Sequence, residues 1–333
     1  MAVRIDTRLT AAIETTRRHL RLLCWGTMKS WLRKYGLMNA DARQSSEAAT
    51  GHSRMMIAGV QMPVPLHGSN VAAMIAQVER AMALFPSIEM ILFSELATHG
   101  PLIPNAAPDP AADEQIFCEL AARHKIWLIP GSSFMRRDNA VYNQACVIDP
   151  QGAVIGRYDK LFPFLPLEDG VAGGKDLMVF DVPGKGRFGL SICYDIWFPE
   201  TTRALTNLGV EVLLHPVLTG TTDRKVELSI ARATAALFQC YVIDVNGLDA
   251  GGVGLSTVID PTGVELHRAG QTPELFPVSI DLSLVRDVRR NGANGLGQVL
   301  KSFRDRTMSF PDYAAGMNAP YLDTLGPLQT VRR

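Results

Sequence analysis

The chain has 333 residues, of which 47% are hydrophobic and 20% charged, a composition typical of a globular protein with a substantial core. Basic and acidic residues balance at 33 each, so the chain lacks the positive excess expected of a nucleic-acid-binding protein. Its five cysteines are odd in number and widely spaced, which argues against a disulfide framework and a structural zinc site. With no apolar run of membrane-spanning length, we expect a cytoplasmic protein.

The first 54 residues form a basic segment whose net charge is opposite to that of the rest of the chain. They contain ten Lys and Arg against four Asp and Glu, which gives a charge of +6. The remaining residues contain 23 Lys and Arg against 29 Asp and Glu, which gives a charge of −6. Apolar residues between 7 and 35 recur at roughly helical spacing, and residues 39–54 are typical of a linker. We interpret 7–35 as a helix packed on the body or on a partner subunit. The alternatives are a helix on an anionic membrane surface, disorder, or a true start at Met55.

From residue 55 onward the pattern alternates between strands and helices. Strands are predicted at 57–62, 90–93, 126–130, 187–192, 210–215, 240–245 and 276–282, and helices at 70–84, 111–124, 198–208 and 225–238. Pro/Gly turns at 149–152 and 260–263 predict two hairpins, over 142–158 and 253–267. Strands joined by both helices and hairpins indicate a mixed sheet system, and the pattern alone goes no further.

Three chemically reactive side chains stand where apolar segments end. Glu95 follows the strand at 90–93, Lys160 follows the second strand of the first hairpin, and Cys193 ends the strand at 187–192. A thiol between a strand and a helix start lies beside free backbone N–H groups, which lower its pKa and can bind an oxyanion. A carboxylate, an ammonium and a thiol in such positions suggest one site for acyl transfer.

In order and spacing, these three segments resemble the signature blocks of the nitrilase superfamily of carbon–nitrogen hydrolases. Glu168 is similar to the second glutamate that amidase members carry shortly after the lysine, and residues 254–263 resemble the family's late hairpin. The resemblance covers residues 55–306, and it implies a four-layer α-β-β-α sandwich that commonly pairs through its helical face. We expect residues 307–333 to form a C-terminal tail that could wrap a neighbouring subunit.

Amide cleavage requires a nucleophile, a proton shuttle and stabilisation of a tetrahedral oxyanion. Cys193 is the predicted nucleophile. Glu95 is the predicted general base, which later protonates the departing amine and activates water. Lys160 and the backbone N–H of Tyr194 are predicted to stabilise the oxyanion, and Glu168 to position Lys160 or the substrate amide. This chemistry requires no metal and no organic cofactor.

The segment after the strand at 210–215 is a candidate pocket wall. In the family that this chain resembles, the matching loop lines the pocket, so we expect Val217 and Thr219 to contact substrate. His215 is interpreted as a hydrogen-bonded residue at the strand end. The other cysteines lie in apolar contexts and are expected only to pack: Cys24, Cys118, Cys146 and Cys240.

The leading prediction is an amidase that hydrolyses a small carboxamide to acid and ammonia through a Cys193 thioester. Tyr194-Asp195 resembles the amide and carbamoyl branches, whereas members acting on nitriles usually have Trp-Glu there. The alternatives are an N-carbamoyl amide hydrolase, a nitrilase, an acyltransferase and a non-catalytic scaffold. The carbamoyl alternative needs a cation for the substrate carboxylate, and the candidates are Arg224, Lys225 and Arg232. We expect a small-molecule amide substrate, a homodimer or larger homo-oligomer, and no nucleic acid.

Overall fold

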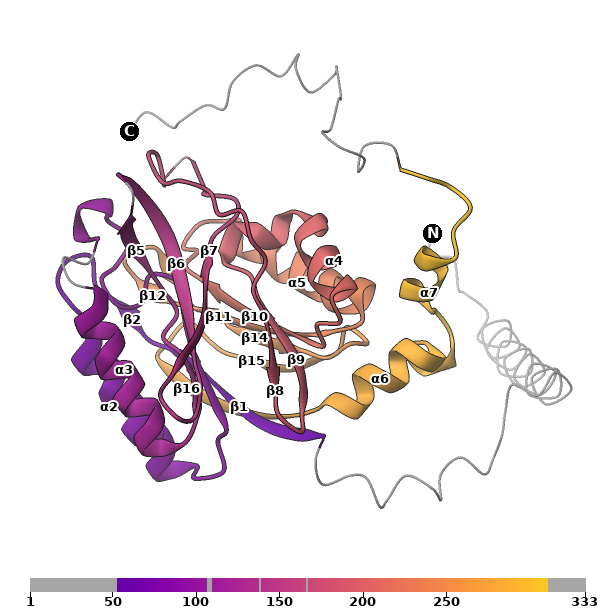
Figure 1. Ribbon diagram of the computed structural model, residues 1–333, viewed down its shortest axis with the longest axis horizontal. Coiled ribbons are helices and arrows are strands. Elements are labelled where there is room, and N and C mark those ends of the chain that lie inside the picture. Colours follow the sequence, from indigo (N-terminus) through magenta and orange to yellow (C-terminus); the bar gives the residue numbers. More distant parts are fainter. Residues whose placement is uncertain (1–52, 107–109, 138, 166, 311–333) are drawn as a thin grey trace, which may run out of the picture. The chain divides into compact units, whose positions relative to one another are not determined.

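The computed structural model describes residues 53–106, 110–137, 139–165 and 167–310 (Figure 1). Almost all of the predicted basic segment 1–54, with Cys24, and of the predicted tail 307–333 therefore lie outside the described residues. Within the described ranges, no helix combines the length and the apolar character needed to cross a bilayer.

Two large sheets form the centre of the described chain. The first has the order β16 (Glu274–Asp281), β1 (Arg54–Gln61), β3 (Met90–Phe93), β4 (Trp127–Ile129), β6 (Ala140–Ile148) and β5 (Ser132–Arg137), with β7 (Val154–Asp159) paired to β6. The second has the order β15 (Glu265–Arg268), β14 (Thr257–Ile259), β11 (Tyr241–Asn246), β10 (Val212–Val217), β9 (Gly186–Leu190) and β8 (Val179–Val182). A small sheet joins β13 (Gly252–Val253), β12 (Leu248–Asp249) and β2 (Pro63–Val64).

Helices cover the outer face of each large sheet (Figure 1). On the first sheet lie α2 (Val71–Leu84) and α3 (Pro110–His124), whose Met74 and Phe117 belong to the same buried cluster as Ile91 of β3. On the second sheet lie α4 (Pro199–Asn207) and α5 (Arg224–Phe238), which contribute Leu205 and Ala235 to another cluster. A third and larger cluster fills the space between the two sheets. The predicted four-layer α-β-β-α sandwich is confirmed.

The periodicity of the sequence explains the elements that were predicted. Helix α2 buries Val71, Met74, Val78 and Ala81, a spacing of three or four residues that gives one apolar face. Strand β3 is apolar at every position because it pairs in parallel with β1 and β4 and is covered on both faces. Both predicted hairpins form, as β6–β7 and β14–β15.

The missed elements have weak patterns. Strand β5 reads SSFMRR and β8 has four residues, so neither stands out as an apolar run. Three further helical elements near the end of the described chain were also missed: α6 (Leu282–Asn291), η4 (Ala293–Gly295) and α7 (Val299–Arg304).

The topology brings several strand ends to one edge. Strands β9, β10 and β11 are parallel, so the segments that follow them begin at the same edge of the second sheet. Strand β3 of the first sheet ends beside them, because the amide of Glu95 donates to the carbonyl of Val217 at 3.2 Å. Glu95 therefore lies at this edge, where it is bonded to the backbone of Val217 and Leu218.

Candidate active site

Cys193 opens a short 3₁₀ helix, η3 (Cys193–Trp197), which is separated from the end of β9 by two residues. Its φ of 46° lies in the left-handed region, which residues other than glycine rarely adopt. The carboxylate of Asp195 holds this turn: Oδ2 accepts from the amide of Ile192 at 3.0 Å and from the Tyr158 hydroxyl at 2.7 Å, and Oδ1 accepts from the amide of Phe162 at 2.8 Å. The turn that presents the thiol is thus tied to the segment that carries Lys160.

Lys160 joins two carboxylates in the interior. Its Nζ donates to Glu95 Oε1 at 2.8 Å and to Glu168 Oε2 at 2.7 Å, and all three side chains are buried. Burial alone would lower the pKa of Lys160, but the charges of Glu95 and Glu168 raise it well above its ordinary value. Burial raises the pKa of Glu95, and the nearby Lys160 charge opposes that rise. The structure therefore brings together three of the four side chains predicted from the sequence, with Lys160 cationic.

Asn143 is part of this cluster, and sequence analysis missed it. Its Nδ2 lies 2.8 Å from both Glu95 Oε1 and Glu168 Oε1 and donates to each. Backbone amides complete the frame: Leu218 donates to Glu95 Oε2 at 3.0 Å, and Phe164 to Glu168 Oε2 at 2.6 Å. The signal in the sequence was an amide side chain on the buried face of the alternating strand β6.

The thiol itself differs from the prediction in one respect. We expected a lowered pKa at a helix start, whereas burial raises the pKa of Cys193 well above its ordinary value, and the charge of Glu95 adds to that rise. Lys160 opposes it without reversing it. The physical reason is desolvation, which penalises a buried thiolate more than one turn of 3₁₀ helix can compensate. The structure therefore favours the thiol form of Cys193.

A second polar cluster lies on another side of the sulfur. Thr219 Oγ1 is 3.6 Å from Cys193 Sγ and donates to Glu227 Oε1 at 3.0 Å, and that carboxylate oxygen is 4.0 Å from Sγ. Thr219, which we predicted to contact substrate, thus lies beside Cys193. Val217 is completely buried in the cluster between the sheets.

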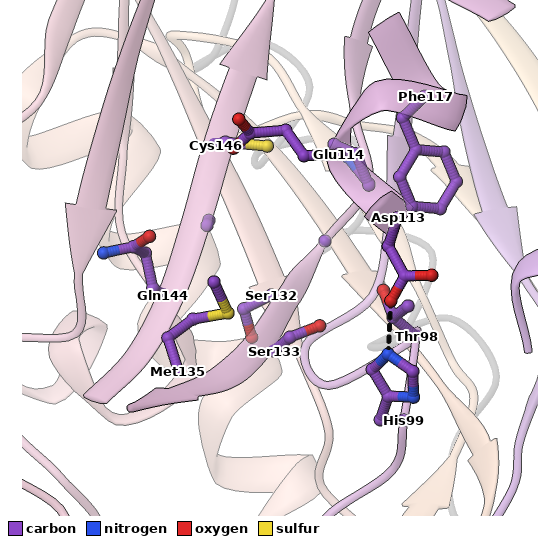
Figure 2. A pocket seen from close by; sticks show the side chains of 13 residues that line it. Thr98, His99, Asp113, Glu114, Phe117, Ser132, Ser133, Met135, Gln144 and Cys146 are labelled. Carbon is purple, nitrogen blue, oxygen red and sulfur yellow. Dashed lines mark hydrogen bonds and ion pairs between the residues drawn. The ribbon is translucent and has the colours of Figure 1, made fainter. Parts of the chain in front are cut away.

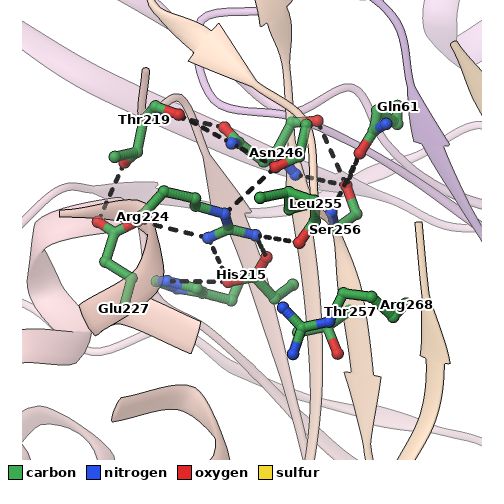
Figure 3. Close-up of polar contacts among 12 residues, drawn as sticks. Gln61, His215, Thr219, Arg224, Glu227, Asn246, Leu255, Ser256, Thr257 and Arg268 are labelled. Atoms are coloured by element: carbon green, nitrogen blue, oxygen red, sulfur yellow. Dashed lines mark hydrogen bonds and ion pairs between the residues drawn. The ribbon is translucent and has the colours of Figure 1, made fainter. Parts of the chain in front are cut away.

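The guanidinium of Arg224 is hydrogen-bonded to side chains and carbonyls of the protein (Figure 3). It is 1% exposed, and its guanidinium donates to both oxygens of Asp244, to Glu227 Oε2 at 3.3 Å, and to the carbonyls of Gly254 and Leu255. Of the other two basic candidates, Lys225 is exposed and Arg232 donates to the Gly263 carbonyl at 2.9 Å. Arg224 is therefore not free to bind a substrate carboxylate.

His215 is bonded to Ser191, two residues before Cys193. Its Nδ1 is 3.2 Å from Ser191 Oγ and 3.1 Å from the Ser191 carbonyl, so it is hydrogen-bonded as expected. Burial lowers its pKa to about 4, which keeps the imidazole neutral near pH 7. The remaining cysteines of the described chain, Cys118, Cys146 and Cys240, are unpaired and belong to apolar clusters.

The pocket shown in Figure 2 is separate from the cluster around Lys160. It is lined by Thr98, His99, Asp113 and Ser133 among others, with His99 Nε2 2.6 Å from Asp113 Oδ2. None of the four predicted catalytic side chains lines it. Across the described ranges, no group of three or more His, Cys, Asp or Glu side chains is arranged to hold a metal ion.

Residues 56–290 match the family model of carbon-nitrogen hydrolases. The chain belongs to this family. The carbon–nitrogen hydrolase is similar to the formamidases of Bacillus thuringiensis and Bacillus anthracis, each 29% identical over 254 residues that span 69% of this chain and 76% of theirs. It is thus an amidase-like hydrolase.

Solved structures agree with the architecture of this carbon–nitrogen hydrolase. A nitrilase-superfamily protein of Saccharomyces cerevisiae superposes with a TM-score of 0.65 at 22% identity, covering 72% of this chain and 94% of its own. An amidase from Nesterenkonia gives a TM-score of 0.64 at 23% identity, covering 72% and 95%. At this identity the likeness supports the fold alone.

Proposed function

We propose that this enzyme hydrolyses a small carboxamide to a carboxylic acid and ammonia through a thioester on Cys193. The contact that carries the proposal is the buried pair of Glu95 and Lys160, whose atoms lie 2.8 Å apart and whose charges both act on the Cys193 thiol. The relatives named formamidases, which this chain resembles over two thirds of its length, support a carboxamide as the substrate.

In the first half-reaction, Glu95 takes the proton from the Cys193 thiol as the sulfur attacks the carbonyl carbon. The carbonyl oxygen becomes an oxyanion, which Lys160 and the Tyr194 backbone N–H stabilise; one such donor is worth about 3 kcal/mol. The C–N bond then breaks, Glu95 returns the proton to the nitrogen, and ammonia leaves. The enzyme retains the acyl group as a thioester.

In the second half-reaction, Glu95 takes a proton from water as the water oxygen attacks the thioester. The same oxyanion donors act again. When the C–S bond breaks, the proton passes to the sulfur and restores the thiol, and the acid departs. Asn143 and Glu168 hold Glu95 and Lys160 in place throughout, because Asn143 donates to Glu95 and to Glu168, and Glu168 accepts from Lys160.

The test is ammonia release from a panel of primary amides, N-carbamoyl amino acids and nitriles, with Cys193→Ala as the inactive variant. Cys240→Ala is the matched control, since Cys240 is a buried thiol in the cluster under α4 and α5. We expect release from amides that vanishes only in Cys193→Ala. Undiminished release in Cys193→Ala, or release from nitriles alone, would contradict the proposal.

A further inference from the structure

Glu227 is a carboxylate beside the nucleophile that the proposed mechanism does not use. It lies in the first turn of α5, is 4% exposed, and places Oε1 4.0 Å from Cys193 Sγ. The same oxygen accepts from Thr219 Oγ1 at 3.0 Å and from Trp197 Nε1 at 3.4 Å. Its position is therefore fixed by groups that themselves surround the thiol.

Arg224 favours the ionised form of Glu227. Its Nη1 donates to Glu227 Oε2 at 3.3 Å, and its other contacts to Asp244 hold the guanidinium in the interior. Burial and the Asp244 charge raise the pKa of Glu227, and Arg224, Thr219 and Trp197 oppose that rise without reversing it. A carboxylate bonded to an arginine and a hydroxyl is the charged form that these partners stabilise.

The charges around the sulfur are predominantly negative. Four carboxylates and two cations give a net charge of −2 when all are ionised: Glu95, Glu168, Glu227, Asp244, Lys160 and Arg224. Asp195, whose pKa burial raises to about 6, adds a fifth carboxylate above that pH. Lys160 and Arg224 each bind two carboxylates, so the positive charge of each is outnumbered by the carboxylates around it.

We propose that Glu227 is a specificity-determining residue, which excludes substrates with a carboxylate near the reacting carbonyl and favours neutral or cationic acyl groups. The proposal rests on the proposed thioester chemistry at Cys193. An atom bound to the reacting carbonyl carbon is two bonds from the sulfur. A substituent directed toward Glu227 therefore comes within hydrogen-bond distance of an oxygen only 4.0 Å from that sulfur. An N–H is stabilised there, and a carboxylate is repelled.

Alkylation of Cys193 tests this without knowledge of the substrate. Iodoacetamide and iodoacetate react alike, since the sulfur displaces iodide, but only iodoacetate carries a negative charge. The rate ratio of the two reagents is measured at the Cys193 peptide by mass spectrometry, with glutathione as the free-thiol reference. For wild-type Cys193, we expect the rate with iodoacetamide divided by the rate with iodoacetate to be at least tenfold higher than the same ratio for glutathione.

Glu227→Gln removes the charge while keeping the length and the oxygen that accepts from Thr219. We expect it to reduce the ratio about tenfold. Glu211→Gln is the matched control, because Glu211 is a buried carboxylate bonded to Arg286 at 2.8 Å and lies at the other end of β10. An unchanged ratio in Glu227→Gln, a wild-type ratio equal to that of glutathione, or a Cys193 that neither reagent reaches would overturn the proposal.

A substrate series on the wild-type enzyme provides a readout that needs no variant. Butyramide, 3-aminopropanamide and succinamic acid differ at the end of the acyl chain, which is a methyl, an ammonium or a carboxylate. We expect kcat/KM for succinamic acid to be at least tenfold below that of the other two, and equal values would count against the proposal. Silence with all three amides would contradict the proposed function instead, while the alkylation ratio would still decide the role of Glu227.

Discussion

At the scale of single residues, the site consists of side chains that depend on one another's charge. Among the described contacts, two side chains link Glu95 to Glu168, and these are Lys160 and Asn143. All four side chains are buried. Removing one partner leaves the buried charges of the others incompletely compensated, which is costly in a protein interior. Each substitution here should therefore affect both turnover and stability.

Lys160→Met removes the cation while keeping most of the volume. We expect kcat to fall about 10²- to 10³-fold, because the oxyanion loses a charged donor. Lys185→Met is the matched control, since Lys185 pairs with Glu89 at the surface at 2.9 Å. Steady-state kinetics measures this effect. A kcat of Lys160→Met close to that of wild type would show that Lys160 does not stabilise the oxyanion.

Asn143→Leu deletes two donors to carboxylates without adding charge. Hydrogen bonds to charged groups contribute about 1.5–3 kcal/mol, so we expect kcat/KM to fall about 10- to 100-fold. The neighbouring Gln144→Ala is the control, because Gln144 bonds to Asp159 outside the site. A kcat/KM of Asn143→Leu equal to that of Gln144→Ala would show that Asn143 has no positioning role.

The sequence could predict which residues form the candidate site around Lys160, but not the side chains that support them. Glu95, Lys160 and Cys193 each end an apolar segment and carry a reactive group, so position and chemistry both mark them. Asn143 and Glu227 lie inside a strand and a helix, where a polar side chain on a buried face is a weaker signal than a reactive group at the end of an apolar segment. The wrong sign for the Cys193 pKa has the same origin, because desolvation depends on packing that no local pattern shows.

At the scale of elements, the turn η3 and strand β7 act as one unit. Asp195 of η3 accepts from Tyr158 of β7 and from two backbone amides, so the same carboxylate holds the segments that carry Cys193 and Lys160. The strands with long apolar runs were predictable because burial on both faces requires such runs. Strands β5 and β8 were missed because their positions beside β6 and β9 depend on pairing with distant segments.

Tyr158→Phe tests the link between these elements. It removes one hydroxyl from a buried hydrogen bond of 2.7 Å to Asp195. We expect the free energy of unfolding to fall by about 1–3 kcal/mol, and kcat to fall with it because the turn is less firmly held. Urea unfolding and kinetics measure the two effects, with the half-buried Tyr142→Phe as control. A variant with unchanged stability and turnover would show that the turn does not need this contact.

At the scale of the whole molecule, the buried charges make stability depend on pH. Burial lowers the pKa of His215 from 6.5 to about 4, so below pH 6.5 the unfolded chain binds a proton that the folded protein does not. Stability from His215 is therefore complete above pH 6.5 and is lost as pH falls toward 4. Asp195 acts in the opposite direction, since its raised pKa makes stability fall as pH rises from 3.8 to about 6.

His215→Asn isolates the first contribution. We expect the difference in unfolding free energy between wild type and variant to shrink by up to about 3 kcal/mol as pH falls from 7 to 4. Urea unfolding at half-unit pH steps measures it. Parallel curves for the two proteins would mean that His215 titrates at an ordinary pKa in the folded state.

The central claim is the thioester on Cys193, and the most direct measurement is acid quenching of the enzyme during turnover of an amide, followed by peptide mass spectrometry. The mechanism predicts a fraction of enzyme in which the acyl group replaces one hydrogen on the Cys193 peptide, absent from Cys193→Ala and discharged by hydroxylamine. Steady ammonia release with no acyl adduct on Cys193, and with Cys193→Ala still active, would contradict it.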